Sequence, residues 1–137
     1  MLKTIKEFLE ENCPLLENRR LAVNFLGEKA GDLGISSVPC APQVLKYADG
    51  GGLFRFDFSI SLRCAFDGDE DGLDAQSFLC GITDWLENMS RQGIFPVLEG
   101  KIGREFLILS ACAPLLNNTK TSRLQAVCSF YYETKGC

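Results

Sequence analysis

The chain has 137 residues with a formal net charge of −4, from 14 basic and 18 acidic side chains, and it contains no histidine. Its length is typical of one domain, and a hydrophobic fraction of 46% indicates a folded globular chain and excludes an intrinsically disordered one. The acidic balance argues against nucleic-acid binding, which needs a basic face. The densest basic spot, Arg19-Arg20, is explained more simply by a solvated turn.

The N-terminal elements are predicted from periodicity and from proline. Apolar residues recur at helical spacing over 2–12, and Pro14 ends that helix because proline disfavours helical backbone in the residue before it. Alternation predicts a short strand over 21–27. Residues 27–37, rich in Gly, Asp and Ser, are expected to form a loop. The two prolines at the start of 38–43 allow only extended edge structure there.

A glycine-rich turn at 49–52 leads into the clearest pattern of the sequence, in residues 54–66. Every second residue there is apolar: Phe54, Phe56, Phe58, Ile60, Leu62, Cys64 and Phe66. Strict alternation predicts a long strand of an antiparallel sheet that is covered on one face. At ~3.3 Å per residue this strand would reach ~43 Å, so we expect it to bend, to bulge or to project past the body of the domain.

The second half of the chain predicts one helix and two more strands. The helix is expected over 73–92, where an apolar stripe is formed by Phe78, Ile82, Trp85, Leu86 and Met89. Strands are predicted over 104–112 and 123–133, with Pro114 and Asn117-Asn118 marking the turn between them. Strands grouped around helices without regular βαβ alternation predict one α+β domain over 1–137. Its mostly antiparallel sheet is expected to have one face covered by the two helices.

The cysteines and the termini predict an intracellular protein without membrane contact. The seven cysteines are scattered, with no C-x-x-C motif and no zinc spacing, so we expect free and mostly buried thiols and no disulfide. The N-terminal residues lack the apolar core of a signal peptide, and no segment approaches the ~20 apolar residues that span a bilayer.

The sequence contains no recognised catalytic or cofactor-binding pattern. The lack of histidine excludes Ser-His-Asp and Cys-His sites, and no glycine-rich phosphate-binding motif follows a predicted strand. Cys80 is the only cysteine on a confidently predicted helix, in its second turn and opposite the apolar stripe, so it is the first residue to test for a reactive thiol. We expect a binding protein and not an enzyme, with no cofactor.

One acidic segment has the first half of a calcium-binding pattern. Asp67, Asp69 and Asp71, spaced D-x-D-x-D-G, are the candidate metal ligands. The twelfth position, which should supply a bidentate Glu, is Phe78, and a strand enters where a helix should. The alternative is a solvated acidic turn whose carboxylates favour the N-terminus of the following helix. A calcium-dependent binding module is therefore one alternative function, and an unassigned small α+β binding domain is another.

The sequence resembles a family of small tail proteins, labelled minor capsid or tail components, of long-tailed phages and prophages of Gram-positive bacteria. The resemblance runs over nearly the whole chain. It rests on Cys13-Pro14-Leu15-Leu16, Asn24-Phe25-Leu26-Gly27-Glu28-Lys29, a proline-rich approach to Lys46-Tyr47-Ala48-Asp49-Gly50, the Phe-rich strand, Trp85-Leu86-Glu87 followed by Gly93, Pro96 and Leu98, and a last strand ending in Tyr131-Tyr132. The acidic run 67–71 departs from the tyrosine and glycine that the family has after the long strand.

The resemblance implies a tail terminator. Such a protein has no catalytic residues, forms a ring of six copies that caps the tail tube, and contacts the tail tube protein and the head-tail connector protein. It is expected in the cytoplasm of the bacterial host during assembly and in the virion tail afterwards. The long strand, at 53–66, and the proline-rich segment 38–42 are the expected contacts between copies.

Overall fold

The computed structural model describes residues 1–16, 21–23, 33–39, 43–65, 69–115 and 121–134, with the side chains of these residues except those at 63–76 and 111–123. Its elements are α1 (Leu2–Asn12), the 3-10 turn η1 (Pro14–Leu16), β1 (Ala22–Val23), β2 (Leu33–Val38), β3 (Gln43–Lys46), β4 (Gly52–Ala65), α2 (Asp69–Gln92), β5 (Lys101–Leu115) and β6 (Thr121–Thr134).

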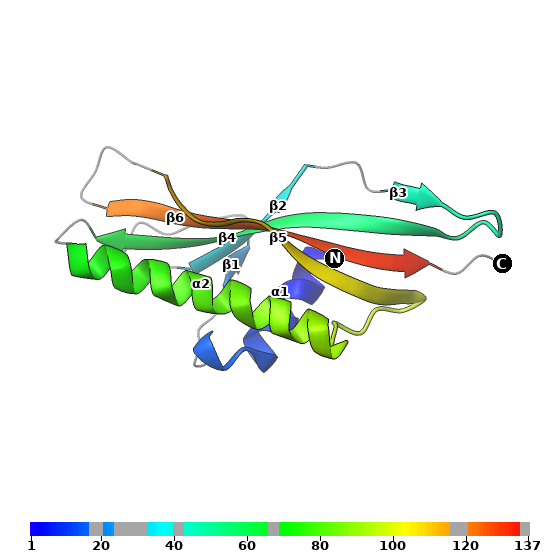
Figure 1. The fold of residues 1–137 in the computed structure, drawn as a ribbon, viewed down its shortest axis with the longest axis horizontal. Helices are drawn as coiled ribbons and strands as arrows, with labels where there is room; N and C mark the ends of the chain where they lie inside the picture. The colour runs from blue at the N-terminus through cyan, green and yellow to red at the C-terminus, as the bar shows by residue number, and fades with distance from the viewer. Residues whose placement is uncertain (17–20, 24–32, 40–42, 66–68, 116–120, 135–137) are drawn as a thin grey trace.

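The described strands form one six-stranded sheet in the order β1-β2-β4-β6-β5, with β3 also paired to β4. All pairs are antiparallel except β1 with β2. Figure 1 shows α1 and α2 on the same side of this sheet. The prediction of an α+β fold with a mostly antiparallel sheet and two helices on one face is therefore confirmed.

The long alternating strand is confirmed as β4, which pairs with β6 along its whole length, from Gly52 opposite Thr134 to Ala65 opposite Thr121. The beginning of β4 runs past the C-terminal end of α2, together with β3 and the neighbouring parts of β5 and β6 (Figure 1). Of the three outcomes expected for an over-long strand, β4 thus shows projection past the body of the domain.

Three boundary predictions were wrong. The expected loop 27–37 contains most of β2, whose polar residues are extended because they pair with β4 and not because of their own propensity. The expected turn at Pro114 lies inside β5. Because β5 pairs only with β6 in the described sheet, a residue without an N–H is tolerated on its free side. The helix α2 begins at Asp69 and not at residue 73.

The helix α1 forms and ends as its sequence predicts. Ile5, Phe8 and Leu9 recur at helical spacing and are buried against the sheet. The helix ends at Asn12, where the Cys13 N–H donates to the Leu9 carbonyl oxygen at 2.9 Å. Pro14, which lacks an N–H, follows at once and begins the 3-10 turn.

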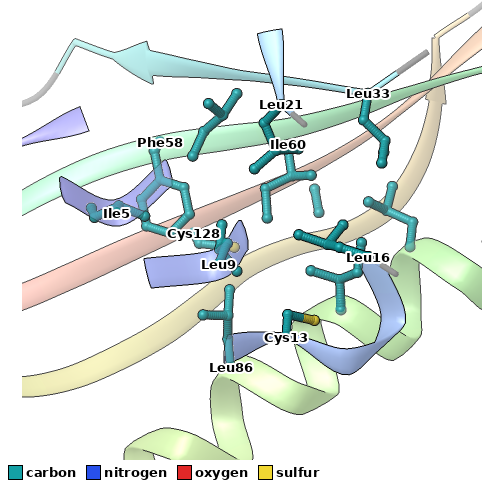
Figure 2. Close-up of a cluster of buried hydrophobic side chains, with 14 of the residues drawn as sticks. Ile5, Leu9, Cys13, Leu16, Leu21, Leu33, Phe58, Ile60, Leu86 and Cys128 are labelled. Atoms are coloured by element: carbon teal, nitrogen blue, oxygen red, sulfur yellow. The ribbon is translucent and has the colours of Figure 1, made fainter. Parts of the chain in front are cut away.

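The hydrophobic core lies between the sheet and the two helices. Phe58 from β4 and Leu86 from α2 converge on the α1 residues Ile5 and Leu9 (Figure 2). A second, aromatic part centres on Phe106 of β5, whose ring lies 4.7 Å from that of Phe130 and 6.0 Å from that of Phe8. Five described core residues lie outside the predicted helix stripes and strand patterns, namely Cys13, Leu16, Leu33, Ile35 and Leu79.

The buried aromatic ring of Phe106 should contribute much of the stability. We expect Phe106→Ala to lower the free energy of unfolding by about 3–5 kcal/mol, because a large cavity would remain between α1 and the sheet. The adjacent variant Leu107→Ala removes an exposed side chain and should cost about 0.5 kcal/mol or less. Urea unfolding of both variants measures the difference, and similar losses would contradict the assignment of Phe106 to the core.

Candidate interaction surfaces

The acidic residues proposed as calcium ligands are only partly placed by the structure. Asp69 and Asp71 lie in the first turn of α2, while Asp67 lies outside the described residues. Helical backbone at two of the three positions departs from a calcium loop, in which the first six residues form a turn. Among the described side chains no cluster of His, Cys, Asp or Glu could hold a metal ion. Calcium binding by this segment stays a prediction.

The prediction that all cysteines are free was wrong for Cys80, which is disulfide-bonded. Its side chain is half-buried and packs against the edge of the core, so the placement opposite the apolar stripe was also wrong. Sequence spacing could not show the bond, because a disulfide depends on neighbours in space. A sulfur in a disulfide has no thiolate, so Cys80 is not a nucleophile in this state.

Cys13 and Cys128 are free and buried, as predicted for structural thiols. Burial, together with the smaller effect of the nearby charge of Glu87, raises the pKa of the Cys128 thiol to about 12. Burial also raises the pKa of Cys13, and backbone hydrogen bonds partly oppose this shift. Both thiols are therefore neutral and unreactive near pH 7.

The face of the sheet opposite the helices carries a buried ion pair. Asp57 of β4 is only 3% exposed, and its carboxylate accepts hydrogen bonds from the Arg55 guanidinium and from the Ser129 hydroxyl of β6. Both carboxylate oxygens are thus engaged within the sheet. The cluster joins β4 to β6 and offers no free carboxylate for chemistry.

The β3–β4 hairpin, which comprises β3, the turn 47–51 and the first residues of β4, forms the first candidate surface. All four residues of β3 are exposed, and two are large and apolar, with Val44 49% and Leu45 54% exposed. These adjacent exposed apolar residues make the projecting strand a candidate contact surface for another molecule. Lys46 completes the exposed strand with a positive charge.

Glycines and one carboxylate shape the turn of this hairpin. The Tyr47 N–H donates to the Gly51 carbonyl oxygen at 2.8 Å, and the Gly51 N–H donates to an Asp49 carboxylate oxygen at 3.0 Å. Gly50 has a φ of 94°, which favours glycine. A Cβ at Gly52 would lie 2.6 Å from the Leu45 carbonyl oxygen, so β3 can approach β4 only because residue 52 has no side chain.

The α1 groove is the second candidate surface, with a volume of about 360 Å³ between α1 and the chain that follows α2. Its apolar side includes Val97, which is 95% exposed, and Ile94, which is 44% exposed. Its other side carries the carboxylates Glu7 and Glu11. The full lining is Thr4, Glu7, Phe8, Glu11, Asn12, Ile94, Phe95, Pro96 and Val97.

The groove wall at 94–97 is fixed by the end of α2 and by the aromatic core. At the helix end the Gly93 N–H donates to the Ser90 carbonyl oxygen and the Ile94 N–H to that of Met89, the pair of bonds typical of a glycine C-cap. Phe95 then packs on Phe106, with ring centroids 5.8 Å apart. A Cβ at Gly103 would lie 2.5 Å from the Phe95 Cβ. The absence of a side chain at Gly103 therefore leaves the space that Phe95 occupies.

The expected contact regions, 53–66 and 38–42, are only partly exposed. β4 pairs with β6 along its whole length, and on its other side with β3 at 52–54 and with β2 at 57–62, so most of its backbone cannot join another chain. Residues 40–42 lie outside the described part of the chain. Sequence reasoning missed β3 and the α1 groove, because neither has a periodic signal. Val97, apolar and placed directly after a proline, was the one hint.

Comparison with known proteins adds no assignment. No protein-family model matches the sequence, and a search of curated proteins found no match. Within the described ranges, no helix has the length and apolar character needed to cross a membrane. The described structure itself offers two exposed apolar surfaces. The β3–β4 hairpin has a positive border and the α1 groove has a negative one.

The pKa of Cys128 generates a prediction on alkaline stability. The folded state keeps this proton up to about pH 12, whereas the unfolded thiol loses it above about pH 8.5. The unfolded state therefore binds fewer protons in this window, and stability should fall by roughly 1 kcal/mol per pH unit. Cys128→Ala should fall less steeply in urea titrations at pH 9 and 10. Equal slopes for the two proteins would contradict the burial of a neutral thiol.

The close approach at Gly52 generates a prediction on the hairpin. We expect Gly52→Ala to separate β3 from β4 and to cost about 1–3 kcal/mol, because the added methyl group meets backbone. The Tyr47 amide should exchange its hydrogen faster. Gly81→Ala is the matched control, since its methyl group meets only the end of the Leu15 side chain in a helix that favours alanine. Unchanged exchange at Tyr47 in Gly52→Ala would contradict the prediction.

Proposed function

We propose that this chain is a structural protein of phage or prophage tails, a tail terminator whose copies form a ring on the end of the tail tube. The observation that carries the proposal is the pair of exposed apolar surfaces on one chain, the β3–β4 hairpin and the α1 groove. A ring needs two different surfaces on every copy, so that each copy contacts one neighbour on each side. The family resemblance of the sequence supports the same function.

The partners follow from the proposal. The chain binds other copies of itself, with six copies expected per ring, and the ring contacts the tail tube protein and the head-tail connector protein. It acts in the cytoplasm of the bacterial host during assembly and stays in the virion tail. The Cys80 disulfide is compatible with this path, because disulfides persist on virions once the reducing cytoplasm is left behind.

The decisive experiment is electron microscopy of tails assembled with and without this chain. With the chain we expect tails of one length joined to heads, and without it tubes of uncontrolled length that carry no head. A further arm uses Val44→Asp, which changes an exposed residue of the hairpin and should reproduce the phenotype of the deletion. Leu109→Asp, on an exposed position of β5, is the matched control and should assemble normally. Tails of normal length without the chain would refute the function.

A further inference from the structure

The α1 groove is chemically suited to a basic apolar strand. Its wall exposes Ile94 and Val97, and its border carries Glu7 and Glu11. Neither carboxylate forms an ion pair within the described ranges of the chain. A ligand of this groove would gain by covering the apolar wall and by placing a positive charge beside α1.

The β3–β4 hairpin carries the complementary chemistry. Val44 and Leu45 are exposed and apolar, and Lys46, which follows them directly, is exposed and forms no ion pair with a described residue. The turn hydrogen bonds and the tight packing over Gly52 hold this strand in an extended shape before it binds. A preformed strand loses little conformational entropy on docking.

We propose that the β3–β4 hairpin of one copy docks in the α1 groove of the next copy, with Lys46 beside Glu7 and Glu11. The proposal rests on the ring function and names the contact that builds the ring. In one chain, β3 and the helices lie on opposite sides of the main strands (Figure 1), so a hairpin reaches the groove of another copy and not its own. Such a contact joins two different surfaces, and repetition of it gives a closed ring when the rotation closes.

Charge favours a second copy as the occupant. The net charge of −4 makes two copies repel each other at long range, so a contact that places opposite charges together is favoured. The hairpin residue Lys46 and the groove carboxylates of α1 provide that placement within one sequence. A different partner, such as the tube protein, would not explain why both complementary surfaces occur on the same chain.

The test uses two variants, each with one surface blocked. Val44→Asp with Leu45→Asp blocks the hairpin, and Val97→Asp blocks the groove; all three positions are exposed, and circular dichroism should show wild-type folding. By native mass spectrometry, the wild type should form one discrete oligomer at high concentration, and each variant alone should be monomeric. An equimolar mixture of the variants should form a heterodimer and nothing larger, because only one intact junction remains.

A charge exchange tests the role of Lys46. Lys46→Glu should weaken assembly roughly fivefold in dissociation constant, as expected for an exposed ion pair. Adding Glu11→Lys to the same chain should restore it. Adding Asp84→Lys, which changes an exposed acidic residue of α2 outside the groove lining, should not restore it.

Several results would overturn the docking. These are a wild-type chain that stays monomeric at millimolar concentration, blocked variants that assemble like the wild type, a mixture that stays monomeric, or a groove that binds the tube protein in place of the hairpin. The ring function fails separately, if tails keep their length without the chain. Tails that depend on the chain while both blocked variants still form rings would refute only the docking.

Discussion

The pairing of β4 with β6 over 14 residues is the constraint on which the other elements depend. β2 and β3 pair with one side of β4, and β5 pairs with the far side of β6, so every described strand except β1 contacts this pair directly. The apolar face of β4 is longer than the helix α2 that packs against it. A helix of 24 residues spans about 36 Å, whereas a strand of 14 residues spans about 46 Å. The excess length of the sheet is the part that projects and carries the hairpin.

The register of this pair is fixed by side chains on both faces. Phe58 and Phe130 face the helices, and Asp57, buried on the opposite face, accepts hydrogen bonds from Arg55 and Ser129. A slip of β6 by one residue would turn its apolar side chains to the opposite face of the sheet and remove Ser129 from the Asp57 carboxylate. Breaking one partner of a buried charge is costly, so the cluster penalises wrong registers more than it adds to stability. Its role is therefore structural specificity of the sheet.

The sequence predicted the elements whose pattern is local and missed those that depend on neighbours. Alternation in 54–66 sufficed for β4, and helical spacing sufficed for α1, because each pattern reports one buried face. Residues 33–38 have no such pattern and are strand only through pairing with β4. The Cys80 disulfide and the groove wall likewise arise from tertiary contacts, in the latter case from Phe95 packing on Phe106. The two interaction surfaces were missed for the same reason, since exposure of Val44 or Val97 is a property of the assembled fold.

The single tryptophan of the chain lies behind the α1 groove. The Trp85 ring is half-buried on α2, and its centroid lies 5.5 Å from that of Phe8, which lines the groove. Indole emission shifts in wavelength with the polarity and hydration around the ring. A molecule that enters the groove contacts Phe8, which packs against Trp85, and so changes the surroundings of the indole indirectly. The protein thus contains an intrinsic optical reporter of groove occupancy, which can follow the contact in real time without an attached dye.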